Sequence, residues 1–350
     1  MPALDTYNPR ALTRTVALLV TLLVIAGTSA AFAVSEKLKV ERAPIGGARV
    51  EPRSLRFSPT CSCPTSSMQL SFRFRRAAKV DVTIVNGAGQ TVRTLAEGQA
   101  LRRGRHAFEW DGRTNAGMVA PDGTYRLRIH FKRERRSILV PIPFQLDTKP
   151  PRVHATATPL VISPDRDGRN DRVTLTYRTN EKGTVELTVD GDVLKTKRAG
   201  PPRVRHTLYW GGRVPVGTAG SGSTSSKNRV PATAGTYELV LTVRDVAGNV
   251  AEVHFTIRVR YIELTQAAYQ TKTGGQLEFE VDTDAAAFSW SLSRTRSAGL
   301  GRALLQDQNV TGRSVSVVIP ADFRPGTYVL RVEANGHSAT APVAVSGGSR

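Results

Sequence analysis

The chain has 350 residues, of which 22% are charged and 40% hydrophobic, a composition that is typical of globular chains and excludes wholesale disorder. Its formal net charge is +20, because 49 lysines and arginines, most of them arginine, outnumber 29 aspartates and glutamates. Such a balance attracts polyanions. The sequence contains no G-x-S-x-G elbow, no H-E-x-x-H zinc motif and no glycine-rich phosphate loop, so we predict that the protein is not an enzyme.

Residues 15–34, TVALLVTLLVIAGTSAAFAV, form an uncharged and mostly apolar stretch. As a helix it would be about 30 Å long, the thickness of a bilayer's hydrocarbon core. We expect residues 1–14 to be a cytoplasmic stub, residues 15–34 a single-pass membrane anchor, and the bulk of the chain extracytoplasmic. The alternative is a signal sequence cleaved after Ala33, which would leave a secreted protein. The length of the run favours the anchor, since the apolar region of a signal peptide has only about 7–15 residues.

Strand patterns dominate the rest of the chain. Residues 35–55 are polar and contain prolines and glycines, so we expect a short stalk there. Beyond them, Leu70, Phe72 and Phe74 alternate with polar residues, as is typical of a half-buried antiparallel strand. Short alternating strands separated by turn residues, without a helix pattern, predict a β-sandwich over residues 56–146.

The same pattern recurs along the chain. The segment HAFEWDGR at residues 106–113 matches HTLYWGGR at residues 206–213 in spacing, and Gly-Thr-Tyr opens a long strand in each of three regions. Repetition at a period of about 100 residues predicts further sandwiches over residues 152–260, with a Gly/Ser-rich loop insertion, and over residues 261–346. The predicted fold is therefore all-β, with tandem immunoglobulin-like β-sandwiches preceded by one N-terminal transmembrane helix.

Three motifs in residues 68–131 carry a family resemblance: VTIVNGAGQTVRTL, then G-x-H-x-F-x-WDGR, then PDGTYRLRI. This region resembles the Ig-like domain named after the flagellar hook-capping protein FlgD. The second repeat is similar more loosely, with Gly211 where the first has Asp111, and residues 163–171 resemble a strand lead-in of bacterial surface Ig-like modules. The resemblance implies a bacterial extracytoplasmic module and does not imply a flagellar role.

The candidate metal site is the segment Asp165-x-Asp167-Gly168-x-Asn170-Asp171. Carboxylates and an amide at alternating positions, with a glycine for the sharp turn, are ligands that Ca²⁺ prefers. The segment lacks the third acidic position and the final bidentate glutamate of an EF-hand. The alternative is an Asx-rich turn whose side chains accept backbone N–H groups. Calcium is the only cofactor that the sequence suggests.

Cys61 and Cys63 form a single C-x-C pair without further metal ligands nearby, so a zinc site is not expected. A local disulfide, a bond to another chain and two unpaired thiols all remain open.

Trp110, Trp210 and Trp290 lie on alternating strands, where tryptophan more often fills a core than binds sugar. His106 and His206 precede the first two tryptophans at the same spacing, which indicates structural positions rather than a catalytic pair.

These features predict a non-enzymatic, membrane-anchored scaffold or adhesion protein of the bacterial cell envelope. We expect its partners to be the membrane, through residues 15–34, and an anionic cell-wall polymer or another envelope protein. Nucleic acid is not expected outside the cell. Most arginines alternate along strands and are expected to form a solvated face. The alternative function is a secreted carbohydrate- or ligand-binding module, possibly calcium-dependent.

Overall fold

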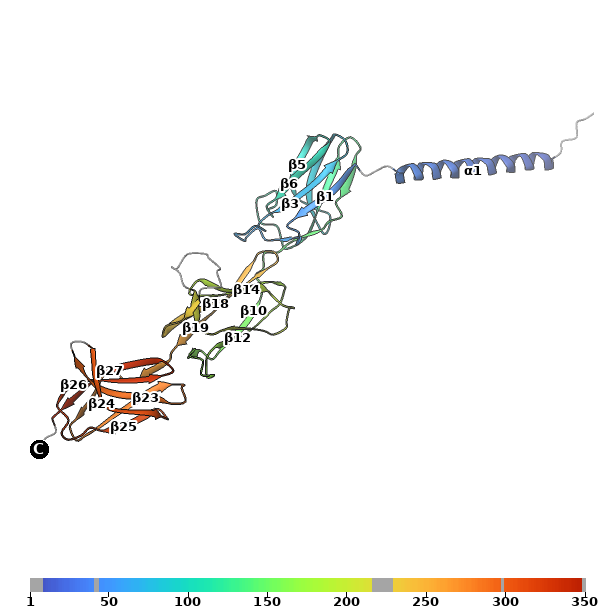
Figure 1. The fold of residues 1–350 in the computed structure, drawn as a ribbon. Coiled ribbons are helices and arrows are strands. Elements are labelled where there is room, and N and C mark those ends of the chain that lie inside the picture. The colour runs from blue at the N-terminus through green and yellow to red at the C-terminus, as the bar shows by residue number, and fades with distance from the viewer. Residues whose placement is uncertain (1–8, 41–43, 216–228, 297–298, 348–350) are drawn as a thin grey trace, which may run out of the picture. The chain divides into compact units, whose positions relative to one another are not determined.

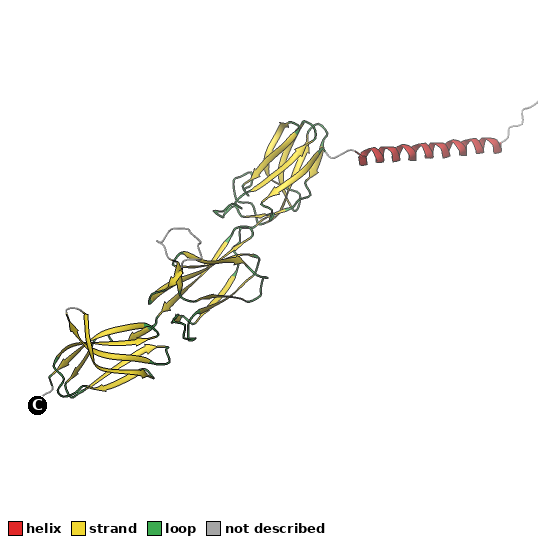
Figure 2. Ribbon diagram, in the orientation of Figure 1, coloured by secondary structure: helices red, strands yellow, loops and turns green. Residues whose placement is uncertain are grey.

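The computed structural model describes residues 9–40, 44–215, 229–296 and 299–347. One helix precedes a long succession of strands (Figure 2), which confirms the all-β prediction. The Gly/Ser-rich insertion expected in the second repeat, residues 217–228, lies outside the described residues.

The helix α1 spans Pro9–Val40 and therefore extends beyond both ends of the predicted residues 15–34 (Figure 1). All side chains of Val16–Ala33 are exposed, and this segment is long and apolar enough to cross a membrane. A helix that is apolar on every side and packs against nothing has no water-exposed polar face. A signal sequence near the N-terminus passes the same test of length and composition.

The rest of the chain belongs to two compact units: unit 1 comprises residues 1–55 and 67–146, and unit 2 comprises residues 56–66 and 147–350. Residues 56–66, which we expected in the first sandwich, thus group with unit 2. Three pairs of sheets occupy residues 45–146, 153–259 and 262–346. The exact domain boundaries stay predictions.

Unit 1 is a sandwich of two antiparallel sheets. Its strands are β1 (Ile45–Glu51), β3 (Met68–Phe74), β4 (Ala78–Asn86), β5 (Thr91–Leu101), β6 (Gly104–Trp110), β7 (Gly123–Phe131), β8 (Arg136–Leu139) and β9 (Phe144–Leu146). One sheet has the order β1-β3-β6, and the other has β9-β7-β4-β5, with β8 beside β7. Phe74 of the first sheet packs edge-on against Phe131 of the second, with ring centroids 5.9 Å apart. The core therefore lies between the sheets.

The expected stalk over residues 35–55 is wrong in its second half, because β1 (Ile45–Glu51) pairs with β3. The alternation of β1 is hidden in the sequence by Gly46 and Gly47. The pairing register also shifts between Gly46 and Arg49, so one apolar side chain no longer follows another at period two.

Unit 2 contains the two-residue strand β2 and two further sandwiches. The strand β2 spans Arg56–Phe57 and is not part of the sheets of the second sandwich. The strands of the second sandwich are β10 (Val153–Thr158), β11 (Val161–Ile162), β12 (Val173–Thr179), β13 (Gly183–Val189), β14 (Asp192–Arg198), β15 (His206–Trp210), β16 (Arg213–Pro215), β17 (Arg229–Pro231), β18 (Gly235–Asp245) and β19 (Val250–Val259). The sheet β10-β12-β15 covers the sheet β11-β19-β18-β13-β14, and β16 pairs with β17. Leu175 and Leu208 of the first sheet share a core with Leu187 and Leu241 of the second.

The third sandwich repeats this arrangement. Its strands are β20 (Ile262–Leu264), β21 (Tyr269–Lys272), β22 (Gln276–Thr283), β23 (Phe288–Arg296), β24 (Gly299–Val310), β25 (Ser314–Val318), β26 (Gly326–Ala334) and β27 (His337–Ser346). A three-stranded sheet, β20-β22-β25, again covers a five-stranded one, β21-β27-β26-β23-β24. Its own core contains Phe279, Leu292 and Leu330.

The repeated sequence motifs have the same local role in each sandwich. The Gly-Thr-Tyr tyrosines donate to a carbonyl four residues upstream: Tyr125 to Pro121 at 2.5 Å, Tyr237 to Thr233 at 3.0 Å and Tyr328 to Arg324 at 2.5 Å. A tyrosine that ties a strand opening to the preceding loop is a feature of immunoglobulin-like sandwiches. The spacing of these motifs thus reports one supersecondary unit used three times.

Candidate functional site

The predicted core tryptophans are confirmed. Trp110 is 0% exposed and Trp210 is 3% exposed, and their indole N–H groups donate to the carbonyls of Arg113 and Arg213 at 2.8 and 3.0 Å. Trp290, in the third sandwich, is 5% exposed. None of the three offers a ring face for sugar stacking, since each fills the space between sheets.

The repeated histidines also occupy structural positions. The Nε2 atom of His106 lies 2.9 Å from the carbonyl oxygen of Arg102, and that of His206 lies 3.2 Å from the carbonyl oxygen of Pro201. Both rings therefore fasten the loop that leads into their strand, at equivalent places in the two sandwiches. They belong to separate sheets and do not form a catalytic pair.

The predicted calcium loop brings its carboxylates together. Oxygen atoms of Asp165, Asp167 and Asp171 all lie within 4.8 Å of one another. These groups also accept backbone N–H groups of the same loop: Asp171 accepts from Arg166 at 2.6 Å and from Gly168 at 2.9 Å. The loop thus has both the convergent carboxylates of a cation site and the hydrogen bonds of an Asx-rich turn.

Two residues of the third sandwich complete this cluster. The side-chain amide of Asn335, in the turn between β26 and β27, donates to Asp165 at 2.9 Å and to Asp167 at 3.3 Å. The predicted ligand Asn170 donates its side-chain amide to Asp284 at 3.2 Å. The N–H groups of Asn335 offset part of the repulsion between the carboxylates. The structure therefore unites Asp165, Asp167 and Asp171, and gives Asn170 a different partner.

The pKa of Asp284 is raised by its surroundings in this cluster. Burial is the largest influence on its pKa and raises it. Hydrogen bonds with Ser163 and Asn170 act in the opposite direction, and the nearby Asp167 and Asp165 raise the pKa further. The net result is a pKa above the ordinary value for aspartate, because the charged form is poorly solvated beside other carboxylates.

Further contacts join the second and third sandwiches beside this loop. The rings of Tyr261 and His337 stack with centroids 3.6 Å apart, and Thr283 donates to the carbonyl of Tyr261 at 3.0 Å. Arg260 forms an ion pair with Asp282. The acidic loop is thus part of a packed joint within unit 2.

Cys61 and Cys63 form a local disulfide, one of the three outcomes that the sequence left open. The disulfide loop packs against the turn that follows β18: the Thr65 hydroxyl donates to the carbonyl of Ala247 at 2.7 Å. A Cβ atom on Gly248 would lie 2.3 Å from the Cys63 sulfur, so only glycine permits this approach.

A second acidic trio was not anticipated. Carboxylate oxygens of Asp147, Glu181 and Asp245 lie within 4.8 Å of one another. Asp245 accepts N–H groups from Ala247, Gly248 and Asn249, and is therefore committed to shaping the turn. Burial, followed by the charges of Asp245 and Asp147, raises the pKa of Glu181. The RDVAGN segment is the sequence signal for this turn.

Arginine side chains stand on outward faces of strands, as predicted. Arg73 of β3, Arg75 directly after it and Arg126 of β7 are exposed, while the apolar neighbours in each strand are buried. Some charges in unit 1 are paired, including Arg76 with Glu134 at 2.9 Å and Lys132 with Asp81 at 2.9 Å. The remainder give the sandwiches a solvated, positively charged surface.

The strand orders and cores above define a protein of tandem immunoglobulin-like β-sandwiches. Residues 58–134 match the FlgD Ig-like domain family, which confirms the resemblance seen in residues 68–131. The chain therefore carries a FlgD-type Ig-like domain.

Curated relatives agree over the same short region. The basal-body rod modification protein FlgD of Salmonella typhimurium strain LT2 is 45% identical over 53 residues, which is 15% of this chain and 22% of that protein. FlgD of Escherichia coli strain K12 is 38% identical over 66 residues, or 19% of this chain and 28% of that protein. The chain thus spans about a quarter of the length of these relatives. Among solved structures, a three-Ig fragment of titin, I67–I69, aligns with 81% of this chain and 93% of its own length at 14% identity and a TM-score of 0.30.

Proposed function

We propose that the protein is a non-enzymatic, membrane-anchored scaffold or adhesion protein of the bacterial envelope, with its sandwiches outside the membrane. The observation that carries this proposal is the helix α1, whose side chains from Val16 to Ala33 are mostly apolar and all exposed. In water such a helix would leave its whole apolar surface solvated, whereas a bilayer covers it.

The proposed partners are an anionic cell-wall polymer or another envelope protein. The exposed arginines of the sandwiches supply salt-sensitive attraction to polyanions. Outer strands supply a second means, since β14 and β24 end their sheets and retain backbone groups that another strand can pair with. Neither interaction needs a catalytic group.

Cell fractionation tests this proposal. We expect the native chain in the membrane fraction, with an intact mass that includes residues 1–34, and protease added outside the membrane should degrade the sandwiches. We also expect cosedimentation with purified cell wall that is lost at high salt and kept in EDTA. A mature chain that begins at Val34 would refute the anchor, and sandwiches protected from external protease would refute the topology.

A second candidate function is a secreted, calcium-dependent ligand-binding module. It is favoured by the approach of Asp165, Asp167 and Asp171 to within 4.8 Å of one another. This alternative predicts that EDTA releases bound carbohydrate and that Asp165→Asn has the same effect. The scaffold proposal predicts no change in either case.

A further inference from the structure

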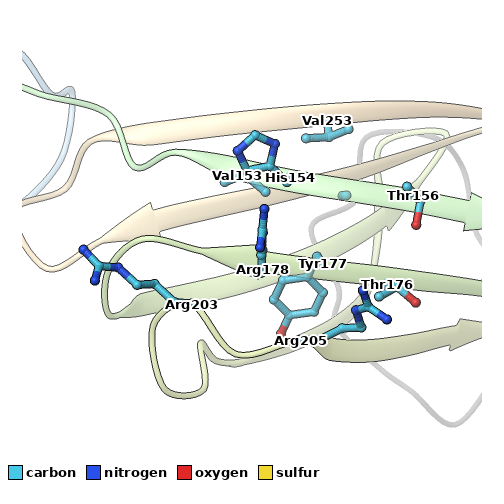
Figure 3. A pocket seen from close by; sticks show the side chains of 10 residues that line it. Val153, His154, Thr156, Thr176, Tyr177, Arg178, Arg203, Arg205 and Val253 are labelled. Atoms are coloured by element: carbon cyan, nitrogen blue, oxygen red, sulfur yellow. The ribbon is translucent and has the colours of Figure 1, made fainter.

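A groove of about 810 Å³ opens on the second sandwich (Figure 3). Its labelled side chains come from β10, β12, β19 and the segment that leads into β15. A neighbouring hollow of about 290 Å³ shares His154, Arg178 and Arg203 with it and adds Arg152. The two hollows therefore adjoin each other, and together we call them the arginine groove.

The arginine groove is lined by cations without matching anions. Arg178, Arg203 and Arg205 line the larger hollow, and no carboxylate side chain lines either one. Arg152, Arg178, Arg203 and Arg205 make no ion pair with an acidic side chain in the described ranges. Four guanidinium groups that repel one another and face no acid create a positive potential in a concave site, where field lines are focused.

Strand pairing and one loop hydrogen bond position the groups that line the groove. His154 of β10 lies directly opposite Arg178 of β12, so both stand on the same outward face of the sheet. The loop before β15 is fastened to the end of β12, because the backbone N–H of Arg203 donates to the carbonyl of Thr179 at 2.7 Å. Arg203 adopts a left-handed backbone with φ 64°, which is uncommon for a residue with a Cβ atom.

Tyr177 forms part of the groove wall, and its hydroxyl is buried. Its side chain is 1% exposed and forms part of the groove wall, yet its hydroxyl oxygen has no hydrogen-bond partner among the residues that the structure describes. Buried hydroxyls are almost always hydrogen-bonded. The ring itself is held in place, with the Lys197 ammonium 5.6 Å and the His206 ring 5.5 Å from its centroid.

We propose that the arginine groove binds a linear polymer of polyol phosphates, with phosphodiester groups on Arg178, Arg203 and Arg205. Guanidinium groups recognise phosphate through paired hydrogen bonds, and the hydroxyls of Thr156 and Thr176 in the same lining suit a polyol. A linear polymer fits a groove better than a bilayer does, because a flat membrane surface contacts protruding side chains and a thin chain can enter a recess. The inference rests on the proposed function in one respect: the groove must face the cell wall.

Binding of purified poly(glycerol phosphate) to the full-length chain in neutral detergent tests the proposal. We expect Arg178→Gln with Arg203→Gln to weaken binding about tenfold or more and to reduce its salt dependence. The matched control is Arg73→Gln with Arg126→Gln, which removes the same charge from exposed strand positions of unit 1. We expect the control to change the affinity about twofold or less.

Tyr177→Phe is a second control, because it removes only a buried hydroxyl and leaves the ring in the groove wall. We expect it to change the affinity about twofold or less, since the hydroxyl oxygen has almost no accessible surface. A larger loss of binding without faster hydrogen exchange of β12 would contradict the placement of the polymer on the arginines.

Three outcomes overturn the proposal: the arginine pair binds as tightly as its control, polygalacturonate or single-stranded DNA binds equally well and is equally weakened by the arginine pair, or anionic vesicles compete as well as the polymer. Cosedimentation with native cell wall separates this failure from that of the proposed function. If the parent chain and the arginine pair sediment alike, the groove assignment fails and the scaffold stands. If the parent chain does not sediment, the proposed function fails, and the polymer titration still decides the groove.

Discussion

Gly248→Ala should destabilise the turn that holds the disulfide loop. Gly248 has φ 108°, where an L-residue is strained, and an added Cβ atom would lie 2.3 Å from the Cys63 sulfur and 2.9 Å from the Cys61 sulfur. The backbone strain costs about 1–2 kcal/mol. The overlap adds about 1–3 kcal/mol, as for other substitutions that overfill a packed site.

The total of about 2–5 kcal/mol predicts exchange faster by a factor of roughly 30 to 4,000, since about 1.4 kcal/mol is tenfold. Hydrogen exchange of the full-length chain measures this at the amides of Ala247, Gly248 and Asn249, which donate to Asp245 at 2.8, 2.6 and 2.9 Å. We expect residues 58–66 to lose protection together with the turn, because the Thr65 hydroxyl donates to the carbonyl of Ala247.

Two comparisons isolate the steric part. Gly191 has φ 87° but nothing within 4 Å of an added Cβ, so Gly191→Ala reports backbone strain alone. With Cys61→Ala and Cys63→Ala in the background, the penalty of Gly248→Ala should fall but stay above the Gly191→Ala value, because the added Cβ would still lie 2.6 Å from the Thr65 hydroxyl oxygen. If Gly248→Ala costs no more than Gly191→Ala in the parent chain, the disulfide does not pack on this turn and the reasoning is wrong.

Three further predictions concern single side chains. Trp110→Ala should lower the free energy of unfolding of the first sandwich by about 3–5 kcal/mol, because it empties a core position and leaves the Arg113 carbonyl without the indole donor. Thermal unfolding of the full-length chain, followed by circular dichroism, should show this loss. Tyr177→Phe should raise the free energy of unfolding by about 1 kcal/mol, since it removes a buried hydroxyl without a partner, and a lower denaturation midpoint would contradict this. The raised pKa of Asp284 makes the joint between the second and third sandwiches most stable below the unfolded pKa of aspartate, and this stability is lost as pH rises through the folded pKa. Asp284→Asn should abolish this pH dependence in hydrogen exchange of residues 163–171, and an unchanged profile would exclude Asp284 as its source.

The sandwiches were predictable because their signal is local. Leu70, Phe72 and Phe74 alternate with polar residues within one strand, and the structure buries all three. β1 was missed for an equally local reason, since two glycines and a register shift erase its alternation. The C-x-C spacing was compatible with a disulfide and with free thiols, so the sequence could not decide between them.

The surroundings of the candidate sites were less predictable, because their members are distant in the chain. Asn335 reaches Asp165 across 170 positions, and no local pattern marks either residue as a partner of the other. Arg178 and Arg203 each have the sequence context of an ordinary solvated position. Only the pairing of β10 with β12 and the fastening of the loop before β15 bring them to one groove.

Because residues 56–66 belong to unit 2, they are synthesised well before the residues against which they pack. Thr65 leaves the ribosome 182 residues before Ala247, the carbonyl to which it is fastened. At a synthesis rate of about 5–20 residues per second, Ala247 is made roughly 10–40 s after Thr65. Until Ala247 has been synthesised, the loop that contains Cys61 and Cys63 lacks the turn on which it packs, so the second sandwich must assemble against a segment that was made much earlier.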